Sequence, residues 1–287
     1  MDNSVFEYYE EALIKLLKTA FQEDHIFQDI TSICCIDQGA HAKANLLLKE
    51  KGIVSGLIFI NTILQTYDSA LSVELHTEDG IEYPEKTILA TIEGPLLSIL
   101  AIERLLLNFL QHLSGISTQT HKCVKLIRNT NCEILDTRKT LPGIRIFQKY
   151  AVKMGGGSNH RMNLEDQILI KNNHLHYLEK THKHPVSYAV KKAKELYPDK
   201  FIEIEVQNEQ MFMEAKAEKP NAILLDNMSC DEIKRCVELN FENIYLEASG
   251  GITLDNLLKY AQTGVNGVSM GALTHSVKGL DICLRIE

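Results

Sequence analysis

The sequence predicts an α+β sandwich domain followed by an α/β domain that contains an incomplete parallel barrel of six strands. Three observations favour this fold class. A length of 287 residues suits two domains. A helix followed by several strands in the first half is typical of an α+β layer. Strand-helix alternation in the second half predicts parallel strands with right-handed crossovers. We expect the domains to span residues 1–115 and 116–287, with the extreme C-terminus able to pack back on the first domain.

The first domain is expected to begin with an amphipathic helix. Ser4-Val5-Phe6-Glu7 fits a capping box, and apolar residues then recur at helical spacing as far as Phe21. Turn signals of Gly, Asp and Pro separate the segments that follow, so these segments are predicted to be strands. The predicted strands are Ala42–Lys49, Gly52–Phe59, Leu71–Thr77 and Lys86–Ile92.

A second helix, predicted over Ser98–Leu113, is apolar nearly all round. Arg104, Asn108 and Gln111 fall at i, i+4 and i+7, so they form one polar stripe on this helix. The stripe is either solvated or faces a subunit interface or a site. The spacing alone leaves both interpretations open.

From residue 116 onward, short strands alternate with helical stretches. The predicted strands are Glu133–Asp136, Gln167–Ile170, Phe201–Val206, Ala222–Leu225, Asn243–Glu247 and Gly267–Ser269. The predicted helices between them include Val186–Tyr197, Glu209–Ala217, Cys230–Leu239 and Leu254–Gln262. Six strands are fewer than the eight of a full barrel, and no strand leads into the GxGxxG turn of a dinucleotide-binding sheet. An incomplete barrel therefore fits better than an open sheet.

Composition narrows the classes of partner and compartment. A net charge of −8 argues against nucleic acid and anionic membranes as partners. Seven cysteines without CxxC spacing argue against a disulfide framework and a structural zinc site. The apolar runs are interrupted before bilayer-spanning length, so no transmembrane helix is expected. Because the N-terminus lacks a secretory signal, we expect a cytoplasmic protein with reduced thiols.

One stretch of this acidic chain is strongly basic. Between residues 138 and 171 there are seven Lys or Arg residues and two acids, a net charge of +5. Lys149 and Lys153 are expected to include a solvated residue of a helix. The other basic groups lie at strand ends or after the glycine triplet Gly155–Gly157, where a barrel places its site, and they suit carboxylates or phosphates. They are Arg138, Lys139, His160, Arg161 and Lys171.

Two glycine-containing segments follow the last two predicted strands. Ser249-Gly250-Gly251 and Ser269-Met270-Gly271 occupy positions where barrels bind phosphate through backbone N–H groups at a helix N-terminus. Together they predict a phosphate site.

Acidic residues lie near the ends of two neighbouring strands. Glu205 and Asp226 could hold the hydroxyls of a sugar or a Mg²⁺ ion, which prefers oxygen ligands. Glu203 points to the same side of its strand as Glu205. An internal ion pair with Lys139 or Lys171 is a compatible alternative. The His174-x-His176 and His182-x-His184 pairs lack a Cys or acidic partner at ligand spacing, so we predict no zinc site there.

Three ordered motifs identify a family. They are Thr137-Arg138-Lys139-Thr140-x-Pro142-Gly143-x-Arg145, then Lys149-x-Ala151-Val152-x-x-Gly155-Gly156-Gly157-x-x-His160-Arg161, then Leu169-Ile170-Lys171-x-Asn173-His174. This set resembles quinolinate phosphoribosyltransferase, the decarboxylating enzyme of NAD synthesis. The resemblance covers nearly the whole chain and extends from Asp29-Ile30-Thr31 to Ser249-Gly250-Gly251-Ile252.

The resemblance implies a phosphoribosyl transfer. Phosphoribosyl pyrophosphate (PRPP) and quinolinate would give nicotinate mononucleotide, pyrophosphate and CO₂ in de novo NAD biosynthesis. Mg²⁺ would accompany PRPP, and no organic cofactor is expected. The enzyme would be a homodimer whose active site is shared between subunits, and such dimers could assemble into a hexamer of dimers.

The resemblance also implies a role for each matched residue. The quinolinate ligands would be Arg138, His160, Arg161 and Lys171, with Arg104 entering from the neighbouring subunit. The groups acting at the reacting atoms would be Lys139, Lys171, Glu205 and Asp226; Lys139 would reach phosphate or pyrophosphate, and Glu205 and Asp226 would bind Mg²⁺ and the ribose hydroxyls. The 5-phosphate of PRPP would lie against Ser249, Gly250, Gly251, Ser269, Gly271 and His275.

Two other functions are kept as alternatives. A nicotinate phosphoribosyltransferase would share the barrel but bind a monocarboxylate without loss of CO₂. A non-catalytic sensor of phosphorylated metabolites would bind ligands without turnover. The number of cations around the base pocket favours a dicarboxylate over the first alternative, and the Glu205, Asp226 and Lys139 set argues against the second.

Overall fold

The computed structural model describes residues 3–287, with side chains from residue 8 onward. The chain forms two compact units that are interleaved along the sequence. Unit 1 comprises Met1–His121, Thr140–Gly156 and Thr274–Glu287, and unit 2 comprises Lys122–Lys139 and Gly157–Leu273. The domain boundary at residues 115 and 116 stays a prediction.

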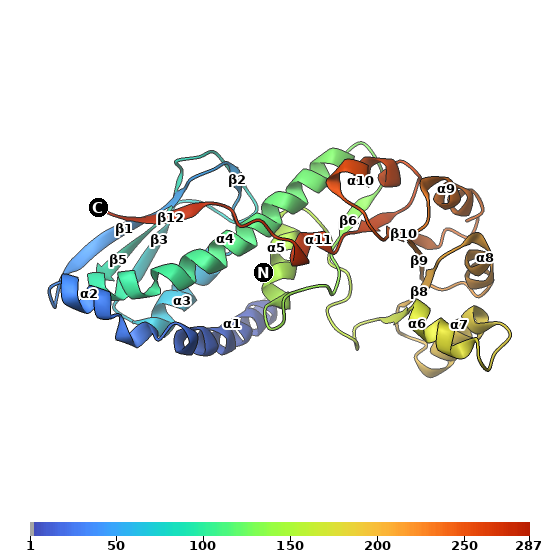
Figure 1. Cartoon of the computed structure of the whole chain (residues 1–287), viewed down its shortest axis with the longest axis horizontal. Coiled ribbons are helices and arrows are strands. Elements are labelled where there is room, and N and C mark those ends of the chain that lie inside the picture. Colours follow the sequence, from blue (N-terminus) through green and yellow to red (C-terminus); the bar gives the residue numbers. More distant parts are fainter. Residues whose placement is uncertain (1–2) are drawn as a thin grey trace. The chain divides into compact units, whose positions relative to one another are not determined.

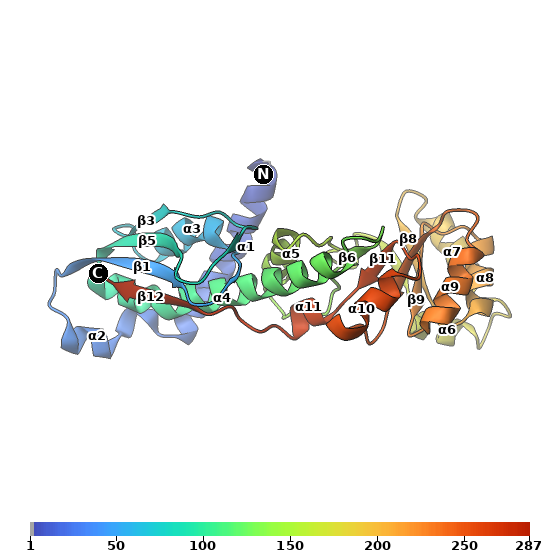
Figure 2. The ribbon, with the colours of Figure 1, turned by 90° about the horizontal axis from the view of Figure 1, so that it is seen from above.

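Unit 1 is built on a four-stranded antiparallel sheet with the strand order β12-β1-β5-β3. The strands are β1 (His41–Leu48), β3 (Ser72–Leu75), β5 (Ile88–Pro95) and β12 (Ile282–Ile286). Alternate residues of β1, namely Ala44, Leu46 and Leu48, are fully buried, so one face of the strand is covered. Seen from above, the C-terminal strand β12 lies beside β1 (Figure 2), with Ala44 opposite Ile286.

Helices complete unit 1. They are α1 (Asn3–Glu23), α2 (Ile30–Cys35), α3 (Ile60–Tyr67), α5 (Arg145–Met154) and the first part of α4 (Leu96–Ile127). Helix α3 contacts β3 of the sheet, and α1 contacts α3 and α5. The apolar spacing predicted for the first helix is seen in α1, where Leu13 and Leu17 are buried. The side chains of the expected capping box, Ser4 to Glu7, lie outside the described ones.

The predicted strand Gly52–Phe59 is wrong beyond its first two residues. Only Gly52–Ile53 forms a strand (β2), which pairs with β4 (Glu82–Tyr83), and Leu57–Phe59 forms a 3₁₀ turn. The chain turns at Gly56, whose φ is 103°. The half-buried carboxylate of Asp79 accepts the N–H groups of Gly56 and Leu57 over 3.0 Å each, which fixes the turn.

Helix α4 continues well past its predicted end at Leu113. The Ser114-Gly115 pair that follows is a weak helix former, but packing overrides this preference. The hydroxyl of Ser114 accepts the backbone N–H of Ser55 over 3.0 Å. A Cβ at Gly115 would collide with the backbone of the C-terminal segment, so the small residue permits close packing.

At 32 residues, α4 is long and apolar enough to cross a membrane by length and composition alone. This corrects the expectation that apolar runs are too short. In its most apolar 18-residue window, 33% of the residues are buried inside the protein. Polar side chains on the helix bond within unit 1, as Gln111 does to the Ile282 carbonyl over 2.7 Å. A core helix passes the same test of length and composition.

Unit 2 contains a six-stranded parallel sheet in the order β6-β11-β10-β9-β8-β7. The strands are β6 (Glu133–Leu135), β7 (Ile168–Ile170), β8 (Ile202–Val206), β9 (Ala222–Asp226), β10 (Tyr245–Ser249) and β11 (Gly267–Ser269). In the part of the chain that the structure describes, β6 and β7 do not pair, so the predicted incomplete barrel is confirmed. The gap lies at the one crossover whose helix, α5, belongs to unit 1.

Helices form an arc outside the strands of unit 2 (Figure 1). They are α6 (Asn172–Leu178), α7 (Pro185–Leu196), α8 (Glu209–Ala217), α9 (Cys230–Glu238) and α10 (Leu254–Ala261), with the short α11 (Ala272–His275) after β11. Outward-facing Ile202, Ile204 and Val206 of β8 are buried beneath this layer. The alternate positions, Glu203 and Glu205, therefore face the interior of the barrel.

Candidate functional site

The carboxyl ends of the six parallel strands bring most of the predicted site residues into unit 2. In barrels this end carries the chemistry. The residues in unit 2 are Arg138, Lys139, His160, Arg161, Lys171, Glu205, Asp226, Ser249, Gly250, Gly251, Ser269 and Gly271. Arg104 and His275 belong to unit 1.

Glu205 and Asp226 form a carboxylate pair bridged by Asn172. The amide nitrogen of Asn172 donates to Glu205 Oε1 over 2.5 Å and to Asp226 Oδ2 over 3.3 Å. Burial raises the pKa of Glu205, and the charge of Asp226 raises it further, whereas Lys171 lowers it. Two neighbouring carboxylates in partial burial favour a cation or a hydrogen-bond donor between them.

Asn172 is the unspecified position of the motif Lys171-x-Asn173, although its place after a strand is typical of a site residue. It is the first residue of α6, immediately after β7, so the helix start holds it at the rim of the barrel. Its Oδ1 is buried and has no hydrogen-bond partner among the described residues. The amide nitrogen, and not this oxygen, faces Glu205 and Asp226. The two carboxylates are therefore the oxygen ligands that could hold a Mg²⁺ ion at this place.

The end of β10 approaches the end of β9 closely. Gly250 has a φ of 100°, and a Cβ there would collide with the side chain of Asn227. Asn227 in turn donates its backbone N–H to the Ser249 carbonyl over 2.8 Å. Glycine is required at this turn, which leads through Gly251 toward the N-terminus of α10.

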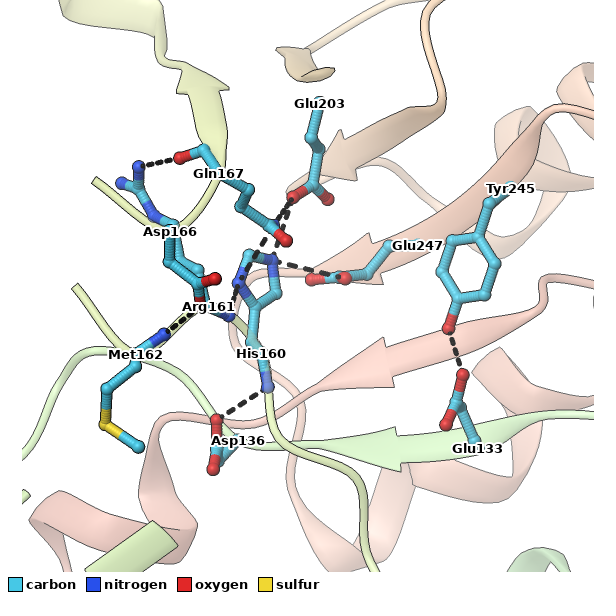
Figure 3. Close-up of polar contacts among 10 residues, drawn as sticks. All are labelled: Glu133, Asp136, His160, Arg161, Met162, Asp166, Gln167, Glu203, Tyr245 and Glu247. Carbon is cyan, nitrogen blue, oxygen red and sulfur yellow. Dashed lines mark hydrogen bonds and ion pairs between the residues drawn. The ribbon is translucent and has the colours of Figure 1, made fainter. Parts of the chain in front are cut away.

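A second acidic group lies deeper in the barrel, around the ring of His160 (Figure 3). Nε2 of His160 is 2.8 Å from Glu203 Oε2 and 3.6 Å from Glu247 Oε2. The two glutamates are 1% and 2% exposed. Burial raises the pKa of Glu247 to about 8, and the charge of Glu203 contributes to this shift.

The floor of the barrel is closed by a tyrosine. The hydroxyl of Tyr245 donates to Glu133 Oε1 over 2.7 Å (Figure 3). It fills the space left by Gly267, where a Cβ would collide with it. A cavity of about 200 Å³ lies between this floor and the His160 ring.

Ser269 points inward rather than toward the rim. It is 4% exposed and its side chain is hydrogen-bonded to Glu247. Gly271, two residues later, is half-buried. In the predicted phosphate-binding segment after β11, the serine side chain is therefore hydrogen-bonded inside the barrel and does not face the rim.

The basic residues of unit 2 differ in exposure. Arg161 is 7% exposed, and its Nη1 donates to the Gln167 carbonyl over 3.0 Å. Burial lowers the pKa of Arg161, and the neighbouring charge of Arg138 lowers it further. Lys139 and Lys171 are exposed, in contrast to Arg161.

In unit 1, Arg104 lines a largely apolar pocket of about 390 Å³ between α1, α4 and the start of α5. Arg104 and Asn108 are exposed, whereas Gln111 is bound to β12, so the predicted polar stripe divides into two parts. His275 is exposed, with Nδ1 2.7 Å from Ser276 Oγ.

The two lysines of α5 have different surroundings. Lys153 is the solvated residue, and Lys149 is fully buried. Sequence spacing identified both as members of one charged run, but only the packing of the helix separates them.

Comparisons with known proteins agree along nearly the whole chain. Family models of quinolinate phosphoribosyl transferase match residues 29–114 (N-terminal domain) and 116–285 (C-terminal domain). The chain is 38% identical to the probable nicotinate-nucleotide pyrophosphorylase (carboxylating) of Bacillus subtilis, covering 96% of this chain and 93% of the relative. It is 40% identical to the protein of the same description from Methanocaldococcus jannaschii, covering 95% and 96%. The nicotinate-nucleotide pyrophosphorylase structure from Francisella tularensis superposes with a TM-score of 0.91 at 36% identity, covering 97% of each chain.

Proposed function

The chain belongs to the quinolinate phosphoribosyl transferase family, and on this premise we propose how its residues divide the work of the reaction. The reaction transfers a phosphoribosyl group from PRPP to quinolinate with loss of one carboxylate as CO₂. Its products are nicotinate mononucleotide and pyrophosphate, in the de novo synthesis of NAD. The observation that carries the assignment of roles is the pairing of Glu205 and Asp226, at the ends of β8 and β9, with Lys171 close enough to lower the pKa of Glu205.

The cationic side holds the pyridine dicarboxylate. Arg138, Arg161 and Lys171 supply positive charge on unit 2, and we propose that Arg104 of a second subunit completes the pocket. The guanidinium of Arg161 suits a carboxylate because its planar fork can donate two parallel hydrogen bonds. Its burial strengthens this interaction, because competing water is scarce.

The carboxylate side holds the sugar of PRPP. Glu205 and Asp226 would bind the ribose hydroxyls and Mg²⁺, and Asn172 would hold the two carboxylates in place. When bound, Mg²⁺ supplies positive charge that offsets the charge of pyrophosphate. Lys139 would contact phosphate or pyrophosphate, and the 5-phosphate would meet backbone N–H groups around Ser249–Gly251. Because Ser269 is committed to Glu247, Gly271 supports this part of the site through its backbone.

The chemistry then depends mainly on placement. The pyridine nitrogen attacks the anomeric carbon, the bond to pyrophosphate breaks, and the ribose ring carries positive charge in between. The carboxylates of Glu205 and Asp226 favour that charge, and the cationic groups favour the leaving oxygens. A quaternary nitrogen withdraws electrons from the ring, so the 2-carboxylate can leave as CO₂. Holding two mutually repelling anions together is the protein's principal contribution.

We propose that the enzyme works in the cytoplasm as a homodimer, which could assemble into a hexamer of dimers. All seven cysteines are free thiols, in keeping with a reducing compartment. The exposed Arg104 and Asn108 on α4 support a shared site, because they leave a polar group available to a partner.

The activity is tested with purified protein, quinolinate, PRPP and Mg²⁺. We expect release of CO₂ together with nicotinate mononucleotide. A variant, Arg161→Lys, keeps the positive charge but lacks the planar guanidinium group. We expect it to raise KM for quinolinate more than KM for PRPP. Turnover of nicotinate without turnover of quinolinate would favour a nicotinate phosphoribosyltransferase. Binding of PRPP with no product from either base would favour a sensor.

A further inference from the structure

Both ring nitrogens of His160 are engaged inside unit 2 (Figure 3). The backbone N–H of Arg161 donates to Nδ1 over 2.8 Å, and the amide nitrogen of Gln167 lies 3.4 Å from the same atom. Because a backbone N–H can only donate, Nδ1 accepts and carries no proton. The ring proton is then on Nε2, which donates to Glu203 Oε2 over 2.8 Å. This pattern describes a neutral imidazole of one tautomer.

The backbone around His160 is fixed as well. Its N–H donates to Asp136 Oδ1 over 2.9 Å, and Asp136 is fully buried at the end of β6. The next residue, Arg161, has its N–H bound by the His160 ring and its Nη1 bound by the Gln167 carbonyl. Arg161 is therefore fixed at its backbone and at its guanidinium group.

The groups that face the ring are compatible with a neutral histidine. Glu203 on β8 and Glu247 on β10 face the ring, and Asp136 and Arg161 flank it. Glu247 Oε2 is 3.6 Å from Nε2, beyond a hydrogen bond, and burial raises the pKa of Glu247 so that it keeps its proton at neutral pH. Glu203 also attracts Arg161, which offsets part of the cost of burying that arginine. An imidazolium would place a second donor, Nδ1–H, against the N–H of Arg161.

We propose that His160 is a positioning residue for Arg161: Glu203 holds it as a neutral imidazole, and it fixes the backbone from which Arg161 reaches a carboxylate of the substrate. This differs from the direct quinolinate contact that the family resemblance implies for His160. It rests on the proposed function insofar as Arg161 binds quinolinate. The charge that recognises the dicarboxylate then comes from arginine and lysine alone, and affinity for quinolinate is constant between pH 6 and pH 7.

The first test reads the tautomer directly in the wild-type enzyme without substrate. Protein labelled with ¹⁵N in histidine is examined by NMR from pH 6 to pH 7, and the His160 signals are assigned by their loss in His160→Asn. We expect one protonated and one unprotonated ring nitrogen at every pH, with and without quinolinate. Two protonated nitrogens, or a titration within this range, would overturn the proposal. So would a stoichiometric metal ion in the purified protein that Glu247→Gln removes, because an ion would replace the Nε2 proton.

The second test uses two substitutions of His160 by an amide residue. Each variant is designed to keep one of the two hydrogen bonds of the ring, either the one to Arg161 or the one to Glu203. In His160→Asn the amide oxygen can take the place of Nδ1 and accept from Arg161, whereas in His160→Gln the longer side chain can reach Glu203 instead. We expect His160→Gln to raise KM for quinolinate about two- to tenfold above that of His160→Asn, the worth of one hydrogen bond. Values of kcat and of KM for PRPP should match between the two. Equal KM values in both variants, or a wild-type KM for quinolinate that rises from pH 6 to pH 7, would contradict the proposal.

Failure of the proposed function would look different. Wild-type protein that forms no product from quinolinate would remove the substrate assignment, but the tautomer of His160 in the free enzyme would be unaffected by that result.

Discussion

Glu203 and Glu205 lie two residues apart on β8 and point to the same side, yet they have different surroundings. Glu203 is 1% exposed and lies 2.8 Å from the ring of His160. Glu205 is half-buried, and the amide nitrogen of Asn172 donates both to it and to Asp226. Sequence spacing could not separate the two residues, because alternation on a strand places both on one face. Their depth in the barrel separates them, and it supports Glu205 as the carboxylate at the rim.

Removing the charge of Glu205 should weaken the binding of Mg²⁺ together with PRPP. We expect Glu205→Gln to lower kcat/KM for PRPP by about 10- to 100-fold, since a charge-assisted contact is worth roughly 1.5–3 kcal/mol. The loss should shrink as Mg²⁺ concentration rises, which initial rates over a Mg²⁺ series would measure. Glu195→Gln, an exposed position on α7, is the matched control. If both variants depended equally on the Mg²⁺ concentration, Glu205 would not be a ligand of the ion.

Glu247 should make stability depend on pH. Burial, and then the charge of Glu203, raise its pKa in the folded protein to about 8, above its value in the unfolded chain. Protonation therefore favours the folded state: this contribution is fully present below the unfolded pKa and is lost as pH rises toward 8. Glu247→Gln stays neutral, so its Tm relative to wild type should increase steadily from pH 5 to pH 8. Thermal unfolding at several pH values measures this difference. The exposed Glu238→Gln should show a constant difference, and a flat result for Glu247→Gln would contradict the buried neutral carboxyl.

Strand β12 joins the last residues of the chain to β1, and its two ends differ in burial. Ile282 is 1% exposed and Ile286 is 43% exposed. Ile282→Ala should lower the free energy of unfolding by about 2–4 kcal/mol, because it removes a buried side chain and leaves a cavity. Ile286→Ala, on the same strand, should change it by less than about 1 kcal/mol. Urea denaturation compares the two, and similar losses would argue against burial as the source of stability in this strand.

Several elements could be predicted from the sequence because their signals are local. The six parallel strands follow from short apolar runs between helical stretches, and the basic residues at their ends follow from the position of those runs. The length of α4 could not be predicted, because burial of Ser114 and Gly115 overrides their weak helix propensity. Likewise, the turn at Gly56 depends on Asp79, a residue 23 positions away.

The candidate site shows the same division. Arg138, Arg161 and Lys171 could be identified from charge and position, since a reversal of sign on an acidic chain is visible in the sequence. The partners that fix the site are uncharged or distant in sequence. Asn172 looks like an ordinary polar residue until β8 and β9 bring Glu205 and Asp226 beside it.

At the scale of the whole molecule, a shared active site makes a distinct prediction. Arg104→Ala and Lys171→Ala homodimers should each be inactive, because every site lacks one cation. After subunit exchange, half of the dimers are mixed and each of these has one intact site, so about a quarter of wild-type activity should return. Rates of CO₂ release before and after mixing measure this recovery. No recovery, once exchange is verified by a size-tagged subunit, would place Arg104 and Lys171 in the same subunit's site.

The pairing of β12 with β1 also affects how the protein is made. Residues 44 and 286 are neighbours in one sheet, so nearly the entire chain must be synthesised before that sheet acquires its edge strand. While the ribosome is still translating, β1 has an open edge that can pair with another nascent chain. The segment of residues 157–273 leaves the ribosome earlier and contains five of the six parallel strands of unit 2. The N-terminal part of the molecule is therefore the first to be translated and the last to be completed.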